Sequence, residues 1–92
     1  MQVSFYATFR PIVGGKTIDI AVQERISVRE LVAAVIARFP ALGPVLLDER
    51  GEVPRGVHVF VNGRGAGYLP QGWQTAITPD DKIDIFPAIA GG

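Results

Sequence analysis

The chain has 92 residues, 48% hydrophobic and 20% charged, which fits one globular domain with a single modest core rather than a disordered segment. Its nine Lys and Arg balance nine Asp and Glu, so there is no excess positive charge to neutralise the phosphates of a nucleic acid. Cysteine is absent, which excludes disulfides, thiolate metal sites and a cysteine nucleophile.

The first predicted elements form a hairpin. Apolar and polar side chains alternate over residues 3–9 and again over residues 17–22, the period of two that is typical of strands with one buried face. Pro11 and the pair Gly14-Gly15 interrupt the pattern between them. We therefore expect two strands joined by a short loop.

A helix is predicted over residues 28–39. Ser27 and Glu30 have the spacing of a capping box at its start, and Pro40 ends the pattern. The apolar side chains that recur at helical spacing are Val28, Leu31, Val32, Val35, Ile36 and Phe39. This stripe needs an apolar partner, and the buried faces of the strands are the only surface large enough to provide one.

The second half of the chain predicts more strands and turns. Asn62-Gly63 is a type I′ turn signal, so the strand that precedes it should start another hairpin, with a short edge strand near residues 66–69 as its return arm. The other expected elements are one helical turn in 41–47, an exposed loop over 48–56, strands over 57–62 and 82–86, an irregular segment over 70–76 and a turn over 78–81. The predicted fold class is α+β, with one main helix across one face of a sheet.

The polar residues do not form the pattern of an enzyme. His58 is the only histidine and has no partner at a spacing typical of a metal site or general base, so a surface position on a strand is favoured. Asp80 and Asp81 fit a turn better than a catalytic pair. No apolar run approaches the length of a membrane span, and the first residues lack the features of a signal peptide. We expect a cytoplasmic protein with no metal and no bound cofactor, which binds neither nucleic acid nor membranes.

Two phenylalanines indicate a partner surface. By strand alternation Phe60 and Phe86 point away from the helix, on the same sheet face as Tyr6 and His58. Exposed aromatic side chains that cluster in this way are typical of binding surfaces. The alternative is that Trp73 or the segment 41–56 folds back and covers them.

The chain ends in Gly91-Gly92, which offers a free carboxylate with no side chain beside it. We predict a folded domain over residues 1–86 and a flexible tail over 87–92, whose six residues span roughly 20 Å when extended. Such a tail could carry the carboxylate of Gly92 into the active site of another protein, where glycine adopts conformations that other residues do not.

Three segments resemble a known family, the β-grasp, ubiquitin-like sulfur carriers represented by the small subunit of molybdopterin synthase (MoaD) and the thiamine sulfur carrier (ThiS). They are Val-Phe-Val-Asn-Gly-Arg at 59–64, Asp-Asp-Lys-Ile-Asp-Ile-Phe-Pro-Ala-Ile-Ala-Gly-Gly at 80–92 and, more loosely, Tyr-Ala-Thr-Phe-Arg at 6–10. The resemblance implies a β-grasp fold with a mixed sheet of four to five strands. The Phe-Pro-x-x-Ala-Gly-Gly ending is similar to that of the MoaD branch.

The resemblance also implies a carrier chemistry centred on Gly92. An E1-like enzyme of the MoeB/ThiF type adenylates this carboxylate with Mg-ATP, and a sulfur donor then leaves a thiocarboxylate on it. The carrier docks on a large synthase subunit of the MoaE type and donates sulfur to build molybdopterin. The residues expected to contact partners are Phe60, Phe86, Pro87, Ile89, Ala90 and Gly91. The protein itself would be a carrier and not an enzyme.

The ending departs from the family pattern at one point. Ala88-Ile89 replaces the common Pro-Val pair, and this also resembles carriers that serve cysteine synthesis. The alternatives that stay open are sulfur transfer for cysteine, thiamine or tRNA thiolation, and a ubiquitin-like modifier or plain interaction module.

Overall fold

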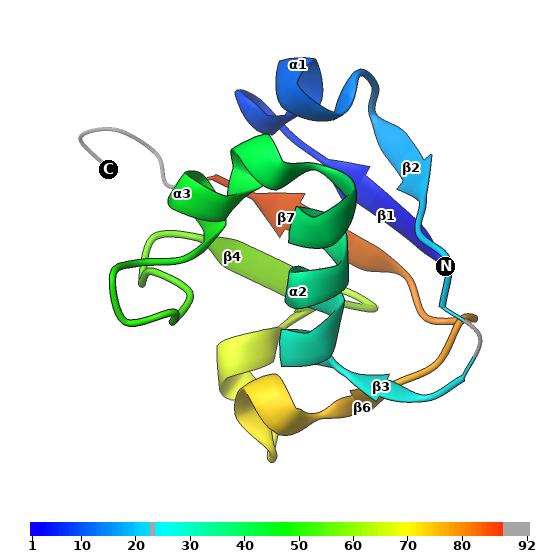
Figure 1. Ribbon diagram of the computed structural model, residues 1–92. Coiled ribbons are helices and arrows are strands. Elements are labelled where there is room, and N and C mark those ends of the chain that lie inside the picture. The colour runs from blue at the N-terminus through cyan, green and yellow to red at the C-terminus, as the bar shows by residue number, and fades with distance from the viewer. Residues whose placement is uncertain (23, 88–92) are drawn as a thin grey trace.

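The computed structural model describes residues 1–22 and 24–87 and has two sheets and a main helix (Figure 1). The elements are β1 Gln2–Phe5, α1 Phe9–Val13, β2 Thr17–Asp19, β3 Ile26–Ser27, α2 Val28–Arg38, η1 Pro40–Leu42, α3 Gly43–Leu46, β4 His58–Val61, β5 Arg64–Gly65, η2 Ala66–Tyr68, η3 Gly72–Gln74, β6 Ala76–Ile77 and β7 Ile83–Phe86. The α+β prediction is confirmed.

The main sheet has the strand order β2-β1-β7-β4-β5. The neighbouring strands β1 and β7 run parallel, and all other neighbours are antiparallel, so the sheet is mixed. The predicted antiparallel pairs β1–β2 and β4–β5 are present. The short loop expected between β1 and β2 is wrong, because residues 6–16 connect them and contain α1. Because β7 lies between β1 and β4, the last strand of the described residues occupies the centre of the sheet.

Helix α2 covers one face of this sheet and forms the core with it (Figure 1). Ser27 caps the helix as predicted: its side chain accepts from the N–H of Glu30, whose carboxylate accepts from the N–H of Ser27. The fully or almost fully buried side chains of α2 are Val28, Leu31, Val32 and Val35. They pack in one cluster with the inward side chains of β1, β4 and β7, namely Val3, Phe5, Val59, Val61, Ile83 and Ile85.

The prediction of one strand over residues 3–9 is wrong beyond Phe5. The chain turns at Ala7, which has a φ of 52°, and continues as α1. Phe9 and Val13, one helical turn apart, are both buried there, so the core is still filled from this segment. Pro11 fits because it lies in the first turn, where a backbone N–H would have no helical partner.

The region after β4 also differs from the prediction. The turn at Asn62-Gly63 is present, with φ of 51° and 86°, but its return arm is β5 at residues 64–65. Residues 66–69, expected as a strand, instead form η2 and its end. The irregular segment 70–76 contains η3 and the start of β6, which pairs with β3 in a second, two-stranded sheet. Two-residue strands are too short for a period of two to reveal them.

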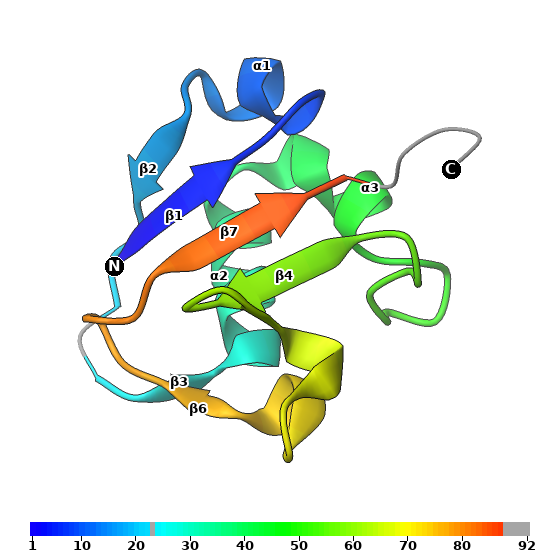
Figure 2. The ribbon, with the colours of Figure 1, turned by 180° about the vertical axis from the view of Figure 1, so that it is seen from behind.

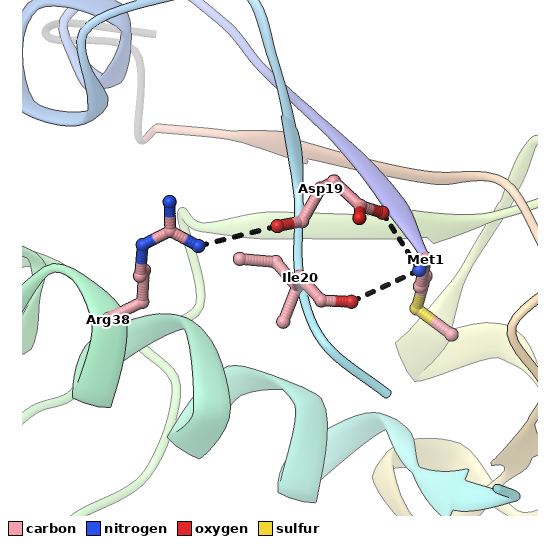
Figure 3. A network of polar contacts seen from close by, with 4 residues as sticks. All are labelled: Met1, Asp19, Ile20 and Arg38. Carbon is pink, nitrogen blue, oxygen red and sulfur yellow. Dashed lines mark hydrogen bonds and ion pairs between the residues drawn. The ribbon is translucent and has the colours of Figure 1, made fainter. Parts of the chain in front are cut away.

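The start of β1 is held by polar contacts (Figure 3). The amino group of Met1 donates to the carbonyl oxygen of Ile20 at 3.0 Å and to the carboxylate of Asp19 at 3.2 Å. Arg38, at the end of α2, donates to the carbonyl oxygen of Asp19 at 3.4 Å. These contacts join β1, β2 and α2 at one end of the sheet.

Candidate functional site

The face of the main sheet opposite α2 is not covered by any helix of the described residues (Figure 2). Four aromatic side chains lie together on this face, and we call them the aromatic patch: Tyr6, His58, Phe60 and Phe86. His58 and Phe60 come from β4 and Phe86 from β7, and Tyr6 directly follows β1. The predicted outward orientation of Phe60 and Phe86 is confirmed.

The rings of the patch contact one another directly. Tyr6 stacks on Phe86 with ring centroids 4.0 Å apart and an interplanar angle of 11°. Phe60 meets Phe86 edge-on at 5.4 Å, and His58 lies tilted against Phe60 at 6.1 Å. These are favourable aromatic geometries, so the patch forms one preorganised surface in which Phe86 is the central ring.

The patch remains accessible. Phe60, Phe86 and Tyr6 are half-buried and His58 is exposed. An entirely apolar hollow of about 360 Å³ lies between Ala7, His58, Phe60, Phe86 and Pro87. Neither Trp73 nor the segment 41–56 borders this hollow; Trp73 packs against the core instead. The alternative in which these residues cover the patch is therefore wrong.

A buried carboxylate lies beside the rings. Asp84 is only 9% exposed although it points to the uncovered face, because its register partners Ser4 and Phe60 flank it on both sides. The hydroxyl of Tyr6 donates to its Oδ1 at 2.7 Å. This hydrogen bond raises the pKa of Tyr6, and burial and the charge of Asp84 act in the same direction. Tyr6 is thus held as a protonated donor.

Arg10 completes the edge of the patch. Its guanidinium lies over the ring of Tyr6, with Cζ 5.2 Å from the ring centroid, and its Nε donates to the carbonyl oxygen of Phe5 at 2.9 Å. The pattern of the sequence did not reveal Arg10 or Asp84 as part of the site. For Asp84 the signal was available, because strand alternation places it on the same face as Phe86.

The patch lies at the C-terminal end of β7. Phe86 is the last residue of β7, and Pro87 borders the apolar hollow. The other predicted site residues, which are Ile89, Ala90, Gly91 and Gly92, lie outside the described residues. The structure therefore brings Phe60, Phe86 and Pro87 together, while the boundary between domain and tail stays a prediction.

The two segments with the strongest family resemblance meet in space. Asn62 Nδ2 donates to Asp81 Oδ1 at 2.9 Å, and the N–H of Lys82 donates to Asn62 Oδ1 at 2.9 Å. Asp81 Oδ2 also accepts from the N–H of Thr78 at 2.7 Å. The bonds from Thr78 and Asn62 lower the pKa of Asp81. These contacts fix the start of β7 against the β4–β5 turn. Asn62 and Asp81 therefore have a structural role.

Within residues 1–22 and 24–87 there is no group of three His, Asp or Glu side chains that could hold a metal ion. In the same part of the chain, none of the helices has the length and apolar character needed to cross a bilayer. His58 lies at the surface, as predicted for a strand histidine.

Comparison with known proteins identifies the family. The ThiS family model matches residues 3–92. Small archaeal modifier protein 3 of Haloferax volcanii is 35% identical over 92 residues, which is all of this chain and 98% of that protein. Its similarity extends through the Gly91-Gly92 end.

Two solved structures share the fold. A chain of the BexX/CysO complex from Amycolatopsis orientalis has a TM-score of 0.79 and 26% identity, over 99% of this chain and 98% of that chain. A candidate molybdopterin converting factor subunit 1 from Pyrococcus furiosus has a TM-score of 0.73 and 25% identity, over 96% of this chain and 95% of that chain. The expected β-grasp, ubiquitin-like fold is confirmed, and the chain belongs to the ThiS family of small carrier and modifier proteins, which are not themselves catalysts.

Proposed function

We propose that the protein is a ubiquitin-like carrier whose C-terminal Gly92 is activated by an E1-like enzyme and converted to a thiocarboxylate. The observation that best supports this is the position of the aromatic patch: it is preorganised, accessible and adjacent to Pro87, where the segment ending in Gly91-Gly92 begins. Carriers of the ThiS family act with E1-like activating enzymes.

The chemistry follows from the terminal carboxylate. At neutral pH this group is ionised and is a poor electrophile. Adenylation forms a bond between a carboxylate oxygen and the α-phosphorus of Mg-ATP and releases pyrophosphate. A sulfur nucleophile then attacks the carbonyl carbon of Gly92, AMP leaves, and a thiocarboxylate is formed. Glycine at residues 91 and 92 keeps side chains out of the activating site.

The aromatic patch provides the docking surface for this reaction. Buried aromatic side chains at the centre of an interface are frequent hot spots, and Phe86 contacts both Tyr6 and Phe60. Six residues follow Phe86, and their extended reach of roughly 20 Å is enough to bring Gly92 into a cleft of the docked enzyme. A partner that binds Phe86 would therefore also orient the residues that follow it toward its active site.

The acceptor of the activated group is the point on which the relatives differ. The Haloferax relative is named a modifier, which favours transfer of Gly92 to a lysine amine, and the Ala88-Ile89 pair in the ending resembles carriers that serve cysteine synthesis. Sulfur donation to molybdopterin, with a MoaE-type large subunit, is a second candidate. The Phe-Pro-x-x-Ala-Gly-Gly ending and the Pyrococcus structure favour it.

Activation can be tested with the full chain and a variant that lacks Gly92. With the E1-like enzyme of the same organism, the full chain should support exchange of pyrophosphate into ATP, whereas the shortened chain should not. Both chains should unfold at the same temperature, because the core of the described residues extends no further than Ile85. Normal exchange with the shortened chain would exclude Gly92 as the activated residue.

Docking is tested separately by Phe86→Ala, measured by calorimetry with the same enzyme. We expect binding to weaken by about 2 kcal/mol or more, the scale of an aromatic hot spot. The matched control is Tyr68→Ala, because Tyr68 is 93% exposed and has no contact with Phe86 among the aromatic pairs of the described residues. Equal affinity of the Phe86 variant and the wild type would show that docking uses another surface.

A further inference from the structure

The carboxylate of Asp84 is a charged group beside the rings of the aromatic patch. Asp84 lies on the central strand β7, with Phe60 opposite it on β4 and the hydroxyl of Tyr6 on its Oδ1. Its Oδ2 has no hydrogen bond from the described residues and is not among their fully enclosed unpaired atoms. Water can therefore still reach Oδ2 in the free protein.

No positive charge of the described residues neutralises Asp84. The only ion pair found among them joins Met1 to Asp19. Arg10 borders the patch, but its guanidinium lies over the ring of Tyr6 and its Nε donates to the carbonyl oxygen of Phe5. Among the described residues, the hydroxyl of Tyr6 is thus the one hydrogen-bond donor to the carboxylate of Asp84.

Docking on the aromatic patch would remove that water. A partner that covers Phe60 and Phe86 must also cover Asp84, which lies opposite Phe60 and two residues before Phe86 on β7. A carboxylate that loses its water without gaining a donor makes binding much less favourable. A partner for this surface must therefore offer Asp84 a donor, preferably a charged one, beside its apolar contacts.

We propose that Asp84 is a specificity-determining residue that receives an arginine side chain of the E1-like activating enzyme. Arginine fits this site better than lysine, because its planar guanidinium can bind a carboxylate and stack on aromatic rings at the same time. Arg10 over Tyr6 shows that this patch accepts a stacked guanidinium. A partner surface with only apolar groups would bind more weakly, because it would offer the carboxylate of Asp84 no donor. The inference rests on the proposed docking of the activating enzyme.

The test compares Asp84→Asn, Asp80→Asn and Phe86→Ala in the full chain. Asp80 is the matched control, because it is an exposed carboxylate in the 78–81 turn. Binding to the purified activating enzyme is measured without ATP, so that docking is separated from chemistry. We expect Asp84→Asn to weaken binding about tenfold or more, mainly through faster dissociation, as for a buried charge pair. Asp80→Asn should bind within about twofold of the wild type, the range of a rim charge.

A second measurement uses the wild-type chain and covers the case in which Asp84→Asn does not fold. The ¹³C resonance of the Asp84 carboxyl carbon should shift when unlabelled enzyme is added, and that of Asp80 should not. An unchanged Asp84 resonance at saturation would overturn the inference.

The outcomes separate this inference from the proposed function. If Phe86→Ala loses affinity and Asp84→Asn binds as the wild type does, the role of Asp84 is refuted while docking on the patch stands. If neither variant loses affinity, docking on the patch is refuted and the inference fails with it. The identity of Gly92 as the activated residue is tested separately, by pyrophosphate exchange with the wild type and with the chain that lacks Gly92.

Discussion

Asp81 joins two segments that are far apart in the sequence, and Asp81→Asn should destabilise the domain by about 1 to 2 kcal/mol at neutral pH. Its carboxylate accepts from the N–H of Thr78 at 2.7 Å and from Asn62 Nδ2 at 2.9 Å. Hydrogen bonds to a charged group contribute about 1.5 to 3 kcal/mol each when protected from water. Asp81 is half-buried, so water reduces this contribution, and the new amide oxygen can keep one of the bonds.

The effect should depend on pH in a defined direction. The two hydrogen bonds lower the pKa of Asp81 in the folded state below the value of about 3.9 expected in the unfolded chain. As the pH falls, the unfolded chain therefore takes up its proton first. The stabilisation by Asp81 is complete above about pH 5, and it is lost as the pH falls through the folded pKa. The difference between wild type and Asp81→Asn should shrink over that range.

Urea unfolding at a series of pH values measures both quantities. Asp80→Asn is the matched control, because Asp80 is the exposed neighbour in the same turn, and its stability should stay within about 0.5 kcal/mol of the wild type. Equal stability of the two variants at pH 7 would refute the structural role of the Asn62–Asp81 contact. A difference that stayed constant down to pH 3 would refute the assignment of the effect to the ionised carboxylate.

Two further predictions concern the core and one turn. Val35→Ala, at a position with 0% exposure, should reduce the free energy of unfolding by about 2 kcal/mol. Val45→Ala, at 42% exposure, should change it little. Equal effects of the two variants in urea unfolding would contradict the packing of α2 on the sheet. Gly63→Ala should destabilise by about 1 kcal/mol or more, because its φ of 86° suits glycine. Gly67→Ala, where a Cβ would meet no atom within 4 Å, should be nearly neutral in thermal unfolding; a larger loss there than at Gly63 would contradict the turn assignment.

The elements with strong local signals could be predicted from the sequence. The capping box at Ser27 and Glu30 and the apolar stripe predicted α2 to within one residue at its end. Asn62-Gly63 predicted the tight turn, because few other residue pairs adopt two positive φ angles in succession. Alternation in β4 and β7 also predicted which face of the sheet holds Phe60 and Phe86.

The other elements depend on contacts that a local pattern does not contain. Phe9 continues the alternation of β1, yet it is buried from a helix, because the turn at Ala7 redirects the chain toward the same core. The β3–β6 sheet joins residues about 50 positions apart through two residues on each side. Alternation places Asp84 on the same face as Phe86, but its contacts with Tyr6 and Phe60 depend on the order of the strands.

The contact between segments 59–64 and 80–92 gives a physical reason why both segments keep residues that resemble the family pattern. Asn62 and Asp81 fix the start of β7, and Phe86 and Pro87 lie at its other end beside the aromatic patch. The central strand β7 therefore connects the Asn62–Asp81 contact to Phe86 and Pro87 at its other end. Loss of the Asn62–Asp81 contact should lower stability without changing the affinity of the folded protein for the activating enzyme.

Intact-protein mass spectrometry tests the central claim most directly. The wild-type chain is incubated with the activating enzyme of the same organism, Mg-ATP and a sulfide donor, and the variant without Gly92 is treated in parallel. We predict that the wild type alone gains the mass difference between sulfur and oxygen, and that fragmentation places this gain on Gly92. An unchanged mass of the wild type, with an enzyme that demonstrably consumes ATP in the presence of the chain, or a gain located on any other residue, would contradict the proposed carrier function.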